Sequence, residues 1–141
     1  MASRFQPRIT KARFVVSPFT PQQMIEFGNA LLADVNARMD RGENVYDQPA
    51  KPLSERYAKW KARRYPPAVR NLKLTGRTRR GAKVVSASEN RVVIGFTDPV
   101  AEQRVERNQR KERQWGVSPA NLRHIGAVIS AARPVRTDRA A

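Results

Sequence analysis

The sequence predicts an α+β fold, in which a long N-terminal amphipathic helix and shorter helices pack on a small antiparallel β-sheet. Two observations carry this prediction. Apolar residues recur at helical spacing from Met24 to Met39, and from Ala82 the period of the pattern changes to two. At 141 residues the chain has the size of one domain. We expect a basic extended arm over 1–19, the domain over 20–131 and a flexible basic tail over 132–141.

The long helix has clear signals at both ends. Thr20 to Gln23 reads as a capping box with proline at the first helical position. Gly42 suits a left-handed C-cap. Before the helix, the run Phe14-Val15-Val16 is β-prone, but the basic residues around it favour a flexible arm over an edge strand.

A second helix should begin at Ser54 and end before Pro66-Pro67. Tyr57, Trp60 and Tyr65 lie among its basic residues and could stack on bases if they were exposed. Because Tyr57 and Trp60 are three residues apart on one side, we expect both in the core. That expectation argues against single-strand recognition, but not against contact with phosphate or with an acidic protein.

The remaining elements follow from local patterns. Leu72-Lys73-Leu74 is expected to be extended, and Thr75 should cap a short helix. Two strands at 83–88 and 91–97 are predicted around a Glu89-Asn90 turn.

Two further helices are predicted near the C-terminus. Asp98 can cap a mostly polar helix over about 100–114, which Trp115-Gly116 would stop. The last helix should follow Ser118-Pro119 and carry an apolar face. The residues expected on that face are Leu122, Ile125 and Ile129.

Charge is unevenly distributed along the chain. The formal net charge is +16, and the segment from Arg56 to Lys83 holds 11 Lys and Arg residues without an acid. Residues 21–50 are net negative. Such a block favours nucleic acid, an acidic protein or an anionic membrane surface as partner. The basic surface expected to face a partner or DNA comprises Arg56, Lys59, Arg63, Arg64, Arg70, Lys73, Arg77, Arg79, Arg80 and Lys83.

Catalytic and metal-binding patterns are not found in the sequence. His124 is the only histidine, there is no cysteine, and the acids are scattered. We therefore expect no enzyme, no metal and no cofactor. No apolar run approaches the roughly 20 residues that span a membrane, and residues 1–5 lack the apolar core of a signal peptide. No motif for sequence-specific nucleic-acid binding is present.

Four short motifs occur in a suggestive order: Pro52 to Tyr57, Leu72 to Arg77, Val92 to Phe96, and Gln114-Trp115-Gly116. Over about residues 20–130 this order resembles the small virion-morphogenesis, neck and tail-completion proteins of tailed bacteriophages. The chain departs from the family pattern in two places. Val100-Ala101 stands where the family has tyrosine-alanine, and a Pro-Ala-Arg-Pro-Phe segment is reduced to residues 117–120.

The resemblance implies a non-enzymatic virion protein of the neck or tail end, assembled in the host cytoplasm as a homo-oligomeric ring. Its partners would be other neck, portal-adaptor or tail proteins, with possible nonspecific contact to genomic DNA. The acidic 26–47 region would then meet the basic block of a neighbouring chain. The alternative is a general sequence-nonspecific nucleic-acid-binding protein, ribosome-associated or DNA-packaging. The residues expected at subunit interfaces are Thr75, Gly76, Arg104, Arg107, Arg110 and Trp115.

Overall fold

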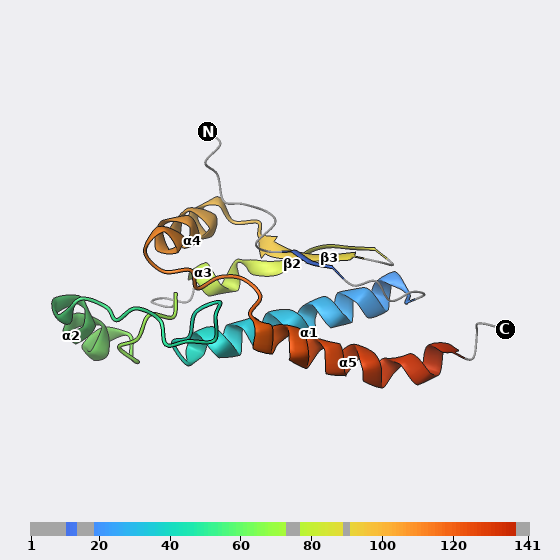
Figure 1. The fold of residues 1–141 in the computed structure, drawn as a ribbon. Helices are drawn as coiled ribbons and strands as arrows, with labels where there is room; N and C mark the ends of the chain where they lie inside the picture. Colours follow the sequence, from blue (N-terminus) through green and yellow to red (C-terminus); the bar gives the residue numbers. More distant parts are fainter. Residues whose placement is uncertain (1–10, 14–18, 73–76, 89–90, 138–141) are drawn as a thin grey trace.

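The computed structural model describes residues 11–13, 19–72, 77–88 and 91–137, with the backbone alone for 11–13, 77 and 133–137. These residues form an α+β fold, as predicted (Figure 1). The helices are α1 (Pro21–Asp40), α2 (Glu55–Arg64), α3 (Arg77–Arg80), α4 (Pro99–Lys111) and α5 (Pro119–Thr137). The strands are β1 (Lys11–Arg13), β2 (Ala82–Ser88) and β3 (Arg91–Phe96).

The elements are arranged in layers around α1. One side of α1 packs on β2 and β3, and α5 runs along another side of the same helix. α3 and α4 pack on each other beside the sheet. α2 lies apart at one end of the molecule, on the left in Figure 1, and α4 lies toward the same end.

The sheet has the strand order β1-β3-β2, and both pairs are antiparallel. The predicted hairpin is present, with a register shift between Val84 and Ser86. Lys11–Arg13 pairs with residues 91–93 of β3, so the expected free arm is wrong for these three residues. Pairing satisfies the backbone N–H and C=O groups of that side of β3. The rest of the arm up to residue 18, and the tail from 138, lie outside the described residues.

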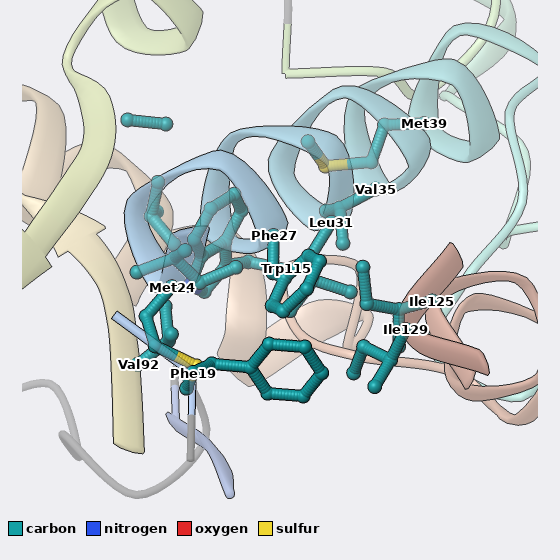
Figure 2. Packing of buried hydrophobic residues seen from close by; sticks show 13 residues of the cluster. Phe19, Met24, Phe27, Leu31, Val35, Met39, Val92, Trp115, Ile125 and Ile129 are labelled. Atoms are coloured by element: carbon teal, nitrogen blue, oxygen red, sulfur yellow. The ribbon is translucent and has the colours of Figure 1, made fainter. Parts of the chain in front are cut away.

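The hydrophobic core lies between α1, the sheet and α5 (Figure 2). Phe19, which the sequence places in the arm, is buried there and packs edge-on against Phe27, with ring centroids 5.0 Å apart. Ile125 and Ile129 are buried as predicted, but Leu122 is 53% exposed. The labelled residues of Figure 2 are Phe19, Met24, Phe27, Leu31, Val35, Met39, Val92, Trp115, Ile125 and Ile129.

The predicted caps of α1, α2, α4 and α5 are confirmed, whereas Thr75, predicted to cap α3, lies outside the described residues. At the start of α1, Gln23 N donates to Thr20 Oγ1 at 3.1 Å, and Thr20 N donates to Gln23 Oε1 at 3.0 Å. Gly42 follows the C-cap with a φ of 75°, in the left-handed region that favours glycine. The other caps that accept a backbone N–H bond are Ser54 at α2, Asp98 at α4 and Ser118 at α5.

Two helix ends differ from the prediction. α4 ends at Lys111 instead of near residue 114, because a glutamine side chain replaces the helical bonds: Gln109 Oε1 accepts from the N–H groups of Gln114 at 2.8 Å and of Trp115 at 3.0 Å. α5 continues to Thr137, past its expected end near 131.

Gly28 lies where α1 packs tightly on the sheet. A Cβ atom there would lie 2.7 Å from Val92 Cγ1 and 2.9 Å from Val84 Cγ2. Valine side chains are stiff, so we expect Gly28→Ala to lower the free energy of unfolding by about 1–3 kcal/mol through overpacking. Urea denaturation followed by far-UV circular dichroism measures this.

Gly126 offers a matched control on the exposed side of α5, because a Cβ atom there would meet nothing within 4 Å. Gly126→Ala should stabilise the protein by about 0.5–1 kcal/mol, since alanine loses less backbone entropy in a helix. Shifts of the same sign in the two variants would contradict the close helix–sheet contact at Gly28.

Candidate interaction surfaces

The acid-free block does not form one continuous basic surface. Part of it bonds to the rest of the chain, and part faces solvent. Arg79 of α3 belongs to the first group, because its Nε donates to Asn36 Oδ1 at 3.0 Å and its Nη1 pairs with Asp40 Oδ1 at 2.9 Å. The Arg79 side chain is only 11% exposed. It fixes α3 to the C-terminal half of α1, which corrects the expectation that it faces a partner.

Lys61 and Arg70 are also engaged within the chain. The buried Lys61 Nζ donates to the carbonyl of Pro67 at 2.6 Å and to Asn71 Oδ1 at 3.2 Å. Arg70 Nε donates to the carbonyl of Lys51 at 2.9 Å, and its Nη1 donates to Asn108 Oδ1 at 3.0 Å. These bonds join the segments before and after α2 to α4, so Arg70 is also withdrawn from the predicted partner surface.

The outward part of the block is concentrated on α2. Arg56, Lys59, Arg63 and Arg64 of this helix are exposed. Arg80 and Lys83 are exposed as well, beside and on β2. Of the other predicted site residues, Lys73, Thr75 and Gly76 lie outside the described residues, as does the side chain of Arg77.

The aromatic residues of the block form a surface cluster beside these charges. Tyr57 stacks on Trp60 with ring centroids 5.5 Å apart and an interplanar angle of 23°, and Tyr65 lies 5.8 Å from Trp60. The prediction that Tyr57 and Trp60 belong to the core is wrong, since neither is part of the buried cluster and Tyr57 is 37% exposed. In the described chain α2 makes no extended contact with another helix or strand, so its aromatic side has no core to face.

The acidic region over 26–47 is largely engaged within its own chain. Four of its five carboxylates bond side chains or backbone of the same molecule, which leaves little acidic surface for the basic block of a neighbour. The pairs are Asp34 with Asn121 and His124, Asp40 with Arg79, Glu43 with Arg41, and Asp47 with the N–H of Ala120.

Two carboxylates have lowered pKa values: Asp47 in the loop between α1 and α2, and Glu112 directly after α4. Burial alone would raise the pKa of Asp47, but hydrogen bonds from Ser118 and from the N–H of Ala120 hold it below its ordinary value. Burial opposes ionisation of Glu112 in the same way. Its bonds from Asn44 and from the N–H of Lys51, at 2.8 and 2.9 Å, lower the pKa of Glu112.

Helix α4 presents charges of both signs. Only Ala101 and Val105 are buried, while the predicted interface residues Arg104, Arg107 and Arg110 are exposed. Trp115, predicted at a subunit interface, is instead 1% exposed and packs on Phe96 within its own chain. The expectation of an intersubunit Trp115 is therefore corrected.

The buried Arg38 is a residue whose role the sequence reasoning missed. Its Nη1 donates to the carbonyl of Gly116 at 3.0 Å and to Asn121 Oδ1 at 2.7 Å, and its Nη2 donates to the carbonyl of Gln114. Burial lowers the pKa of Arg38 to about 10, against the fields of nearby carboxylates. Its position seven residues after Leu31 places it on the buried face of α1, a spacing that is visible in the sequence.

A metal site and a membrane span are absent from the part of the chain that the structure describes. No three His, Cys, Asp or Glu residues group there as metal ligands would. No helix in the same residues has the length and apolar character needed to cross a membrane. Comparisons with protein families, with curated proteins and with solved structures found no match.

Proposed function

We propose that this protein is a structural virion protein of a tailed phage, a ring-forming neck, head–tail connector or tail-completion subunit that joins head and tail. The order of short motifs suggests this class of protein. The assembly part of the proposal rests on one observation, the charged outer side of α4.

Helix α4 exposes acid and base that are not used within the chain. In the described residues, Glu102, Glu106, Arg104, Arg107 and Arg110 take part in no hydrogen bond or ion pair through their side chains. Glu106 and Arg110 are four residues apart on the helix and still form no pair. Charges of both signs on one helix suit Arg–carboxylate pairs across a subunit interface. In a closed ring each subunit contributes two different surfaces that match.

The test is the oligomeric state of the purified full chain. We expect electron microscopy and light scattering to show rings, formed alone or on mixing with the portal, adaptor and tail-tube proteins of the same genome. Arg104→Glu/Arg107→Glu should abolish assembly and leave the circular dichroism spectrum unchanged. Arg91→Glu/Arg123→Glu reverses the same charge at exposed positions on β3 and α5 and should assemble normally. A chain that stays monomeric at high concentration and joins none of these proteins would contradict the proposal.

A second candidate function is general, sequence-nonspecific nucleic-acid binding. The observation that favours it is the net charge of +16, combined with the internal engagement of most described carboxylates. Neutralising about six phosphates would give a log–log salt slope near −5 on B-DNA. A flat salt response would exclude this candidate.

A further inference from the structure

We infer that α2 is a binding site for single-stranded nucleic acid, with phosphates along its basic stripe and bases on its aromatic ridge. The basic stripe is defined here as Arg56, Lys59 and Arg63, and the aromatic ridge as Tyr57, Trp60 and Tyr65. Ring formation requires neither this binding site nor a preference for single strands over duplex. Single-strand binding by α2 therefore stands or fails independently of the assembly proposal.

The helical spacing places the two groups side by side. Residues three and four apart share one side of an α-helix. Arg56, Lys59 and Arg63 follow this spacing and are all exposed. Tyr57 and Trp60 occupy the adjoining side, where their rings stack. A stripe of cations next to partly exposed aromatic rings combines the two features by which proteins hold single strands.

Within the described residues, the acids do not balance the positive charge of this helix. Glu55 is the only acidic residue of α2, and its Oε2 lies 3.8 Å from Lys59 Nζ. In the described chain, Arg56 and Arg63 have no acidic partner. The described carboxylates without a hydrogen bond or ion pair are Glu26, Glu102 and Glu106. A second copy therefore offers few acids, whereas a polyanion supplies one charge for every nucleotide.

The aromatic ridge favours a single strand over a duplex. Unpaired bases can stack on side-chain rings, whereas the bases of a duplex already stack on one another. The ridge is also held in place before any ligand binds. Lys61 of α2 is buried and bonds Pro67 and Asn71, and Arg79 of α3 bonds the carbonyl of Asn71, so α2 is tied to the rest of the molecule although it leaves the core. A fixed platform loses little conformational entropy when a base stacks on it.

The test measures fluorescence anisotropy of a labelled oligo(dT) and of a duplex of equal length with the full chain. Tyr57→Ala/Trp60→Ala should weaken oligo(dT) binding about tenfold or more. The same variant should leave duplex binding largely unchanged. Arg56→Gln/Arg63→Gln should weaken both and reduce the single-strand salt slope by about 1.4. Arg91→Gln/Arg123→Gln removes the same charge from exposed positions on β3 and α5 and should change oligo(dT) binding little.

Intrinsic fluorescence gives a second readout that does not depend on affinity. The chain has two tryptophans, and Trp115 is 1% exposed. Oligo(dT) should therefore quench Trp60, and Trp60→Phe should remove the quenching. All α2 variants should keep the oligomeric state of the wild type, which separates this test from the assembly test.

Three results would overturn the inference. The first is an absence of oligo(dT) binding by the wild type at low salt. The second is equal loss of single-strand and duplex binding in the aromatic variant. The third is binding of poly-glutamate that matches oligo(dT) in affinity and in sensitivity to Tyr57→Ala/Trp60→Ala, because the surface would then recognise an acidic protein.

Discussion

Replacing Arg38 by alanine is expected to lower the free energy of unfolding by about 2–5 kcal/mol, because it removes a large buried side chain and leaves buried carbonyl groups without a donor. Arg38 is fully buried, and its guanidinium satisfies the carbonyls of Gln114 and Gly116 and the side chain of Asn121. Alanine would leave the two buried carbonyls without this donor, and each such group costs about 1–3 kcal/mol, while Asn121 Oδ1 would keep its bond from the N–H of Ser118.

The physical role of Arg38 explains the size of this effect. It joins α1 to the segment between α4 and α5 and to the first turn of α5, which are 76 to 83 residues away in the chain. Arg38→Lys keeps a positive charge but loses the planar set of donors that reaches several acceptors at once. We therefore expect Arg38→Lys to be destabilising as well, by less than Arg38→Ala.

Urea denaturation followed by far-UV circular dichroism measures both variants. Arg41→Ala is the matched control, because this arginine stands three residues further along, has a side chain that is 53% exposed, and forms a surface ion pair with Glu43. Arg41→Ala should change the free energy of unfolding by no more than about 0.5 kcal/mol. Equal stability of Arg38→Ala and Arg41→Ala would show that the buried network does not hold the two parts together.

The features that could be predicted from the sequence are the local ones. Capping at Thr20, the hairpin and the apolar face of α1 follow from residues close together in the chain, and the structure contains all three. Local spacing shows which residues share a side of a helix, but not what lies opposite that side. For this reason the spacing predicts Tyr57 and Trp60 in a core that α2 does not reach, and predicts burial for Leu122, which is exposed.

For the candidate site, the sequence predicts the number of basic residues but not which of them face solvent. The sequence shows 11 basic residues in one block, but it does not show that Arg79 bonds residues 39 and 43 positions away, or that Arg70 bonds Asn108, 38 positions away. Such partners are set by the packing of distant elements. Because these arginines are held within the chain, the outward charge is concentrated on α2 and α4.

Trp115→Ala is expected to lower the free energy of unfolding by about 3–5 kcal/mol. The Trp115 side chain is 1% exposed and packs on Phe96, with ring centroids 4.6 Å apart. Alanine would leave a cavity where the α4–α5 connection meets the sheet. A loss of this size is a large part of the roughly 5–15 kcal/mol that stabilises a typical domain.

Trp115→Phe should lower the free energy of unfolding by only a fraction of this amount. Within the described part of the chain the indole Nε1 is buried without a hydrogen-bond partner. Burying an unpaired donor costs about 1–3 kcal/mol, and phenylalanine removes this cost while keeping an aromatic ring beside Phe96. Removing the unpaired donor therefore offsets part of the packing energy that is lost because the phenylalanine ring is smaller than the indole.

The two Trp115 variants also separate a core role from an interface role. Circular dichroism at low protein concentration measures unfolding, and light scattering at high concentration measures assembly. The buried position predicts a graded loss of stability from the wild type to Trp115→Phe to Trp115→Ala, with rings still formed by folded Trp115→Phe. A tryptophan at a subunit contact would give the opposite pattern, in which assembly is lost and the unfolding of the single chain is unchanged. That outcome would restore the expectation drawn from the Gln114-Trp115-Gly116 motif, and would contradict the packing of Trp115 against Phe96.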